Sequence, residues 1–362
     1  MRNPKTGTEQ GVPLGADVID VLPAHRFDVT RLWDFLGTRL PDLGPRPIVR
    51  QFQSGHSNPT FLLRGEGHAY VLRKKPPGTL LPGAHAVERE YRVMKALQGS
   101  AVPVPTMRLL CEDPSVIGTP FFVMDAVGGR LVAEPSLPVL VHGDRRPAQQ
   151  AMVTTLANLH AVDWRAVGLE TFGKPRDYAA RQVRTWTRQV AASRTDDMPG
   201  LDRLGSWLAD HAPDNVRTTI VHGDFRAGNM ILDATKPKIV AVIDWELSTL
   251  GHPLADLGYF LMPYHLPAGI EGVKGLEGLD LDLAGLASPD DLIDLYASVH
   301  GAVDLSTLTY FVGFSMFRLA AILQGVYKRA RLGNASHADA GRVGQTAGLV
   351  ADHGLKVIGT LR

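Results

Sequence analysis

Cysteine is almost absent from this chain of 362 residues, and the single Cys111 cannot form a disulfide within the chain. A fold that depends on disulfides is therefore excluded, and a reducing compartment is expected. An excess of charge is missing too, because 38 Lys and Arg residues face 37 Asp and Glu residues. A net charge of +1 gives no indication of a nucleic-acid partner.

Long uninterrupted apolar stretches are also missing. The first ten residues have no apolar core of a signal peptide. The most apolar late segment, residues 308–326, is interrupted by Arg318 and Gln324, which predicts a buried helix and not a membrane span. With 44% hydrophobic and 21% charged residues, the composition is that of a globular protein. We therefore expect a cytoplasmic protein without a membrane partner.

A β-hairpin is the clearest local pattern. Two short segments rich in β-branched residues, 230–232 and 239–243, flank a polar turn that contains Pro237. Asn229 precedes the first strand and Asp244 follows the second. Pairing of these strands would bring the two side chains together at the open end of the hairpin.

A third oxygen-bearing side chain belongs to the same pattern. Asp224 lies five residues before Asn229, on the segment that leads into the hairpin. Carboxylate and amide oxygens suit a hard cation such as Mg²⁺. An Asp, four intervening residues, an Asn and a later Asp such as Asp244 are the spacing found in phosphoryl-transfer enzymes. There the first Asp contacts the attacking hydroxyl, and the Asn and second Asp hold Mg²⁺.

Three motifs together carry a resemblance to a known family. They are His222-Gly223-Asp224 with Asn229, then Ile243-Asp244-Trp245, and finally Gly251 to Asp256. The chain resembles the aminoglycoside phosphotransferase and choline kinase-like family over roughly residues 47–262, and members of that family share the protein-kinase fold. The family usually has Asp where this chain has His252. The Asp that matches Asp256 braces the catalytic loop and is not a reactant.

The resemblance implies an α+β, bilobal protein-kinase-like fold. Residues 1–46 are expected to form a leader, loose up to about Ala24, followed by a helix capped by Asp28. Residues 47–126 would form the nucleotide-binding N-lobe, an antiparallel sheet plus one helix. Residues 127–362 would form a mainly helical C-lobe with the catalytic loop and acceptor site. Apolar periodicity predicts helices over residues 147–160, 177–190, 201–211 and 308–326.

A Gly/Ser-rich loop joins two predicted strands, residues 48–52 and 60–64. Such a loop can direct backbone N–H groups toward phosphate oxygens, and Ser54, Ser57 and Asn58 are its candidate nucleotide-binding residues. A plain hairpin turn is the alternative. The position of the loop, upstream of a basic strand and of the later carboxylates, favours phosphate binding.

The strand that follows this loop ends in basic residues. By the resemblance, Arg73 occupies the place of the phosphate-binding Lys of kinases, and Lys75, on the same face, is the alternative. The alternative is a solvated basic strand end, in which neither Arg73 nor Lys75 binds phosphate. The next helix, residues 85–97, has one apolar face. Glu90 is the expected partner of the strand cation, with Glu88 as the alternative.

An extended segment, residues 120–124, ends at a Gly-containing linker, residues 125–130. It resembles the interlobe hinge of the family. This implies that backbone groups from Met124 to Ala126 bind the adenine edge, with Phe122 or Met124 packed against the ring.

The implied reaction is transfer of the γ-phosphate of ATP or GTP to a hydroxyl group of a small molecule, with Mg²⁺. Asp224 would accept or orient the proton of the hydroxyl, Asn229 and Asp244 would hold Mg²⁺, and Arg226 would neutralise charge on the transferred group. Two alternatives are a nucleotide-binding, pseudokinase-like module and a metal-dependent phosphoesterase. A pseudokinase-like module would not require intact Asp224, Asn229 and Asp244. A phosphoesterase would not explain the upstream Gly/Ser-rich loop, the strand cation and the helix Glu.

The acceptor stays open between two classes. Acidic residues in segment 271–304 would suit a cationic acceptor such as an aminoglycoside, unless they are simply solvated. The basic tail, which begins at Arg318, would suit an anionic acceptor, unless it is a surface face. Residues 318–330 and 72–78 resemble the family branch fused to acyl-CoA dehydrogenases in animals. That branch phosphorylates hydroxyacyl thioesters, which implies an acyl-CoA-type acceptor.

Overall fold

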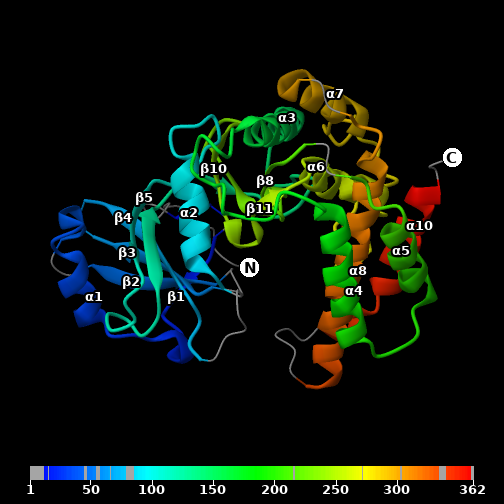
Figure 1. Cartoon of the computed structure of the whole chain (residues 1–362). Coiled ribbons are helices and arrows are strands. Elements are labelled where there is room, and N and C mark those ends of the chain that lie inside the picture. The colour runs from blue at the N-terminus through cyan, green and yellow to red at the C-terminus, as the bar shows by residue number, and fades with distance from the viewer. Residues whose placement is uncertain are drawn as a thin grey trace, which may run out of the picture. The chain divides into compact units, whose positions relative to one another are not determined.

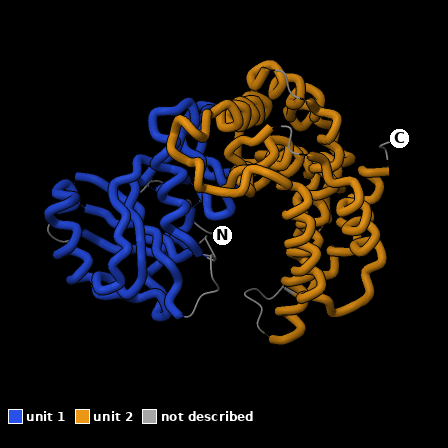
Figure 2. Tube along the Cα trace, in the orientation of Figure 1, with its two compact units in different colours: residues 1–132, 228–248 blue, residues 133–227, 249–362 orange. Residues whose placement is uncertain are grey.

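The computed structural model describes residues 12–14, 16–44, 47–53, 58–65, 67–78, 85–214, 217–270, 272–301, 304–333 and 340–359. The chain divides into two compact units (Figure 2). The first consists of residues 1–132 and 228–248, and the second of residues 133–227 and 249–362.

A six-stranded sheet is the centre of the first unit (Figure 1). Its strands are β1 (Val18–Ile19), β2 (Ile48–Phe52), β3 (Thr60–Arg64), β4 (Ala69–Lys74), β5 (Met107–Cys111) and β6 (Phe121–Asp125). The order is β1-β2-β3-β4-β6-β5, and every neighbouring pair is antiparallel. The predicted antiparallel sheet is therefore confirmed.

The expectation of a loose leader up to Ala24 is wrong for its described part. Val18 pairs with Phe52 at the edge of the sheet, and the N–H of Leu22 donates to Gln51 Oε1 at 3.0 Å. A strand of two residues is too short to show an alternating pattern, so no sequence pattern indicated this strand.

Helix α1 (Val29–Leu36) packs on one face of this sheet. The Asp28 carboxylate caps it by accepting the N–H of Arg31 at 3.0 Å. Its apolar side chains belong to a buried cluster that includes Leu32, Leu36, Phe61, Leu63, Tyr70, Leu72, Phe121 and Val123. Successive residues of a strand point to opposite faces of the sheet, so Arg73, which follows the clustered Leu72, points to the other face.

Helix α2 (Val87–Leu97) contacts β5 and β6. Its Tyr91 ring lies 6.2 Å from the ring of Phe122, which neighbours Phe121 and so points away from the α1 side. Helix α2 thus shares a sheet face with Arg73, which positions its carboxylates near that cation.

The predicted hairpin is present and belongs to the first unit. Strands β9 (Met230–Leu232) and β10 (Ile239–Val242) pair antiparallel, and β7 (Arg130–Leu131) pairs with β9. The first unit therefore contains residues from both sides of the helical segment 133–227.

The second unit is mainly helical. Its helices are α3 (His142–Ala161), α4 (Tyr178–Ser193), α5 (Pro199–Asp210), α6 (Leu254–Leu261), α7 (Pro289–His300), α8 (Leu308–Arg331), α9 (Ala340–Gly344) and α10 (Ala347–Gly359). Strands β8 (Thr219–Val221) and β11 (Thr249–Gly251) pair antiparallel. Helix α3 begins at His142, five residues before the predicted start at Pro147, because this proline lies inside the helix instead of opening it.

Helix α8 packs against α4, α6 and α10. Within the described part of the chain, it alone is long and apolar enough to cross a membrane, with a mean hydropathy of 1.3. However, 67% of that apolar window is buried inside the structure, as in the core helix of a soluble protein.

His252 lies just before α6 and has a capping role. Its Nδ1 accepts the N–H of Leu254 at 3.2 Å, a bond that the Asp usual in the family could also make. The imidazole stacks on the ring of Phe311 with centroids 4.5 Å apart. Burial, with a smaller effect from His160, lowers the pKa of His252 to about 4. The capping imidazole is therefore neutral at physiological pH.

Acid should destabilise the fold through His252. The unfolded chain binds a proton at this residue near pH 6.5, whereas the folded chain does so only near pH 4. The neutral His252 therefore contributes about 3 kcal/mol to the free energy of unfolding above pH 6.5, and this contribution is lost as the pH falls to 4. We expect His252→Asn, which keeps a cap acceptor, to reduce the loss of unfolding free energy between pH 7 and pH 4.5 by about 2 kcal/mol in urea titrations. His211→Asn, at an exposed histidine, is the control. Equal pH dependence in His252→Asn and wild type would contradict this assignment.

Candidate active site

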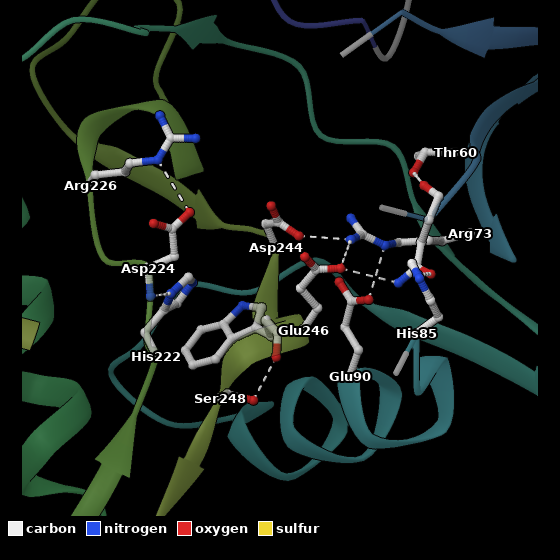
Figure 3. Close-up of polar contacts among 12 residues, drawn as sticks. Thr60, Arg73, His85, Glu90, His222, Asp224, Arg226, Asp244, Glu246 and Ser248 are labelled. Atoms are coloured by element: carbon white, nitrogen blue, oxygen red, sulfur yellow. Dashed lines mark hydrogen bonds and ion pairs between the residues drawn. The ribbon is translucent and has the colours of Figure 1, made fainter. Parts of the chain in front are cut away.

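One buried cation contacts three carboxylates in the first unit (Figure 3). Arg73 Nη2 lies 2.7 Å from Asp244 Oδ1 and 3.4 Å from Glu246 Oε2. Arg73 Nε lies 3.0 Å from Glu90 Oε2, although without the alignment of a hydrogen bond, so this contact is an ion pair only. The Arg73 side chain is 10% exposed and that of Glu90 is 2% exposed. We call these four residues the Arg73 cluster.

The electrostatics of the Arg73 cluster follow from burial and from an excess of negative charge. Burial alone would lower the pKa of Arg73, but Glu90, Asp244 and Glu246 outweigh it and raise the pKa. Burial raises the pKa of Glu90 to about 7, opposed by Arg73 and by the N–H of Trp245. Because one cation faces three carboxylates, the cluster is a place to which a further cation is attracted.

A second cation–carboxylate pair lies beside the first. Lys75 Nζ contacts Glu88 Oε1, and both side chains are more exposed, at 22% and 28%. The two alternatives that the sequence left open for the cation and for its partner are therefore both engaged. Arg73 pairs with Glu90, and Lys75 pairs with Glu88.

Asn58 connects the end of the Gly/Ser-rich loop to the Arg73 cluster. Its side chain is fully buried, with Nδ2 3.3 Å from Glu246 Oε2 and Oδ1 3.0 Å from His85 Nδ1. Both ends of the amide are thus engaged inside the protein, which favours a role in holding the loop over direct contact with phosphate. Ser54 and Ser57 lie outside the described residues. Sequence reasoning missed His85 and Glu246, and the only available signal was a carboxylate two residues after Asp244.

The hairpin fixes Asn229 and Asp244 at the same end. The N–H of Ile243 donates to the carbonyl oxygen of Asn229 at 2.9 Å. The indole of Trp245, which is 1% exposed, donates to the carbonyl oxygen of Val242 at 2.9 Å and anchors the turn. Between them Asp244 has a φ of +67°, in the left-handed region that Asp adopts more readily than most residues.

The donor chemistry at this end fits Mg²⁺. The Asp244 side chain is 31% exposed, and Asn229 is 4% exposed. Mg²⁺ is usually held by one or two carboxylates together with substrate phosphates. No group of three or more His, Cys, Asp or Glu residues that could hold a metal occurs in the described segments. One carboxylate and one amide oxygen suit a Mg²⁺ site that substrate phosphates complete, and the surplus negative charge of the Arg73 cluster adds attraction for a divalent cation.

The segment after β8, which carries Asp224, is held by α6 in the second unit. The Asp256 carboxylate accepts the N–H of His222 at 2.6 Å and of Gly223 at 2.9 Å. His160 Nε2 lies 3.4 Å from Asp256, and its Nδ1 lies 2.7 Å from the hydroxyl of Tyr296. Asp256 is 1% exposed, so it braces the loop from a buried position.

The Asp224 side chain is 18% exposed. Its neighbours are cationic side chains and a hydrogen-bond donor. Arg226 Nε lies 3.2 Å from Asp224 Oδ2 (Figure 3). Burial would raise the pKa of Asp224, but Arg226, Arg318 and a hydrogen bond from Tyr259 outweigh it and lower the pKa. Asp224 is consequently an ionised carboxylate at neutral pH, able to accept a hydrogen bond from an alcohol.

Arg318 of α8 also holds this loop. Its Nη1 donates to the carbonyl oxygen of Gly223, and its guanidinium lies 5.1 Å from the Tyr259 ring centroid and 5.4 Å from that of Trp186. Sequence reasoning assigned Arg318 to the basic tail and gave Tyr259 no role. No local sequence pattern indicates the contacts of Arg318 with Gly223 and Tyr259, because these residues are far from Arg318 in the chain.

The linker after β6 differs in part from the expected adenine site. Met124 lies in β6, with Phe122 buried in the same strand. The N–H of Asp125 donates to Thr106 and that of Ala126 to Ala69, at 2.9 and 3.1 Å. Adenine would therefore have to use carbonyl oxygens here or backbone groups further along the linker.

The fold and this site together define a kinase-like phosphotransferase. A protein of Ralstonia eutropha, described as a candidate aminoglycoside phosphotransferase, is 40% identical with a TM-score of 0.83, over 92% of this chain and 99% of that chain. The macrolide 2'-phosphotransferase MphH of Brachybacterium faecium shares the fold alone, at 18% identity and a TM-score of 0.55, over 88% of this chain and 97% of its own.

The chain belongs to the phosphotransferase enzyme family, whose model matches residues 48–290. The resemblance found in the sequence and the kinase-like fold are thus confirmed, and the chain is a phosphotransferase of the small-molecule kinase type.

Two curated relatives extend the family assignment. Acyl-CoA dehydrogenase family member 10 of mouse is 45% identical over 317 residues, covering 88% of this chain and 29% of that protein. Acyl-CoA dehydrogenase family member 11 of chicken is 42% identical over 347 residues, covering 93% and 44%. The chain therefore spans less than half the length of these relatives.

The Arg73 cluster predicts a specific loss of stability. We expect Arg73→Ala to lower the free energy of unfolding by about 3–5 kcal/mol, because Glu90 would remain buried without its partner. Lys75→Ala, at the more exposed neighbouring pair, is the matched control and should cost about 1 kcal/mol or less. Both are measured by urea unfolding followed by far-UV circular dichroism. Replacing Arg73 and Glu90 together by Met and Leu should recover much of the loss. Similar losses for both alanine variants would refute the assignment.

Proposed function

We propose that this chain transfers the γ-phosphate of ATP, or of GTP, to a hydroxyl group of a small-molecule acceptor, with Mg²⁺ as the cofactor. The backbone bond between Ile243 and Asn229 carries the proposal, because it fixes Asn229 and Asp244 at one end of the hairpin, and Asn229 follows Asp224 by only five residues. Asn229 and Asp244 would hold Mg²⁺. The single, buried Cys111 supports a reducing, cytoplasmic location as part of the proposal.

The protein groups would act mainly by positioning. Bound Mg-nucleotide supplies the phosphoryl group and neutralises its charge. Asp224 has a lowered pKa and is therefore a weak base, so it would orient the hydroxyl and receive its proton late. Phosphoryl transfer through a loose transition state needs little prior activation of the alcohol, which agrees with this role. Arg226, which contacts Asp224, would neutralise charge on the transferred group.

The nucleotide-binding residues would be organised by the Arg73 cluster. Arg73 would contact the phosphates while Glu90 and Glu246 keep it in place. Asn58 would support the phosphate loop that contains Ser54 and Ser57. Met124 and Ala126 would border the adenine, through carbonyl oxygens or side chains, because the Ala126 N–H is already donated to Ala69.

For the acceptor, we favour a hydroxyacyl compound of the acyl-CoA type over an aminoglycoside. Several acidic residues of segment 271–304 have structural partners: Asp291 forms a capping box with Ser288, and Asp282 lies 2.5 Å from Arg146. Asp280 accepts the N–H of Leu283 at 3.0 Å. These groups are used to form turns and helix ends, which weakens the argument for an acidic wall that binds a polycation. The names of the acyl-CoA dehydrogenase relatives support an acceptor of the acyl-CoA type.

Asp224→Asn tests the transfer reaction. We expect wild type to release ADP from Mg-ATP with a hydroxyacyl-CoA but not with an aminoglycoside, in an assay over both acceptor classes and free hydroxy acids. Asp224→Asn should lower turnover about 10²–10⁴-fold while ATP binding, measured by calorimetry, is retained. ATP binding without turnover on any acceptor would favour the binding module. Phosphate release that needs no acceptor would favour a phosphoesterase.

Arg226 provides a second functional test. We expect Arg226→Ala to lower kcat about tenfold or more with little change in the KM for ATP, because its charge would matter most in the transition state. Arg226→Lys, which keeps the charge, should recover part of the rate. An Arg226→Ala enzyme with unimpaired turnover would remove this residue from the mechanism.

A further inference from the structure

A cavity of about 380 Å³ lies between helices α4 and α8, within the second unit. Figure 1 shows the two helices side by side. Its walls include Trp186, Gln189, Ala321, Ile322, Lys328 and Arg329. The volume is within the range of small-ligand sites, about 300–1,000 Å³, and the walls combine an apolar surface with two cations.

One stripe of α8 runs from the catalytic loop to this cavity. Arg318, Ile322, Gly325 and Arg329 follow at spacings of four, three and four residues, so they share one helix face. Arg318 contacts Gly223, next to Asp224, whereas Ile322, Gly325 and Arg329 line the cavity. The rise of a helix places Arg329 about 16 Å along the axis from Arg318. Trp186 joins the two ends, because it lines the cavity and its ring centroid lies 5.4 Å from the Arg318 guanidinium.

The charges at the far end of the stripe are positive. Lys328 Nζ donates to the carbonyl oxygen of Ala192 at 2.7 Å. Arg331 is engaged by Asp196 at 3.3 Å. Arg329 is exposed and has no ion-pair partner among the residues that the structure describes. The described lining of the cavity contains no carboxylate, so an anionic group would be attracted there and a polycation repelled.

We propose that this cavity binds the tail of the acceptor molecule. An apolar segment of the acceptor lies against Trp186 and Ile322, and an anionic group beyond it lies at Lys328 and Arg329. The reacting hydroxyl is at the other end, beside Asp224. This inference rests on the proposed function, and it defines the acceptor as an elongated molecule with a hydroxyl at one end and negative charge at the other.

Two positions of α8 allow the cavity to be changed with matched controls. A Cβ atom at Gly325 would meet only Arg329 Nη1, at 3.6 Å, so a larger side chain there enters open space. Gly325→Phe fills the cavity, and Gly325→Ala, which favours the helix, is its control. Arg329→Glu reverses the charge, and Arg203→Glu, at an exposed position of α5, is the control for charge reversal.

The test compares a hydroxyacyl-CoA with the same hydroxyacyl group on pantetheine, which lacks the phosphates. We expect Arg329→Glu to raise the KM for the CoA ester about tenfold or more, with kcat within about twofold of wild type and the KM for the pantetheine ester unchanged. Gly325→Phe should raise both KM values, and the two controls neither. An unchanged KM for the CoA ester in Arg329→Glu, or equal changes for both esters, would overturn the proposal.

A binding measurement separates failure of this proposal from failure of the proposed function. Trp186 fluorescence is followed while coenzyme A is added, and Trp186→Phe identifies the signal. If wild type phosphorylates no acceptor but binds coenzyme A, and Arg329→Glu weakens this binding at least tenfold, the cavity assignment is supported without the reaction. If wild type does not bind coenzyme A, or Arg329→Glu binds it equally well, the assignment is wrong whatever the outcome of the kinase assay.

Discussion

The contact of Arg73 with Glu90, Asp244 and Glu246 is the constraint on which the first unit depends. It joins strand β4, helix α2 and the turn after β10, and Arg73 and Asp244 are separated by 171 positions in the sequence. A buried guanidinium requires several acceptors, because its planar fork offers five donors and loses its hydration on burial. Asp244 and Glu246 accept hydrogen bonds from Nη2, Glu90 adds an ion pair at Nε, and the negative charge of all three raises the pKa of Arg73 despite burial. This explains why residues 228–248 belong with the sheet although helices precede and follow them in the chain.

The same contact has an excess of negative charge, and this has a consequence for the proposed Mg²⁺. Asp244 and Glu246 share one nitrogen of Arg73, so a cation at Asp244 would compete with Arg73 for that carboxylate. Glu246 can then keep Arg73 in position, because it is also anchored by the Asn58 amide. Glu246 thus ties the position of the strand cation to Asn58, at the end of the Gly/Ser-rich loop. If Asp244 turned to a cation, Arg73 would still be held by Glu90 and Glu246.

The sequence was informative where the chemistry is local. Asn229 and Asp244 could be related through one hairpin, because strand pairing over a short turn fixes which residues meet. The roles of Glu246, His85 and Arg318 could not be predicted, since their partners lie far away in sequence and no periodic pattern links them. Strand β1 was missed because two residues carry no alternation. The choice between Glu88 and Glu90 was open because helical spacing puts both near the same strand, and only the packing of α2 separates the buried pair from the exposed one.

Helix α8 links the shape of the loop that carries Asp224 to the proposed acceptor site. Arg318 donates to the Gly223 carbonyl and, with Arg226 and Tyr259, lowers the pKa of the neighbouring Asp224. The face of α8 that carries Arg318 continues into the cavity at Ile322 and Arg329. A rigid helix transmits the position of one end to the other, so an acceptor held at Arg329 has its distance to Asp224 fixed by the helix and not by a mobile loop. In a reaction that depends on positioning more than on covalent chemistry, such a fixed distance is a direct source of selectivity for acceptor length.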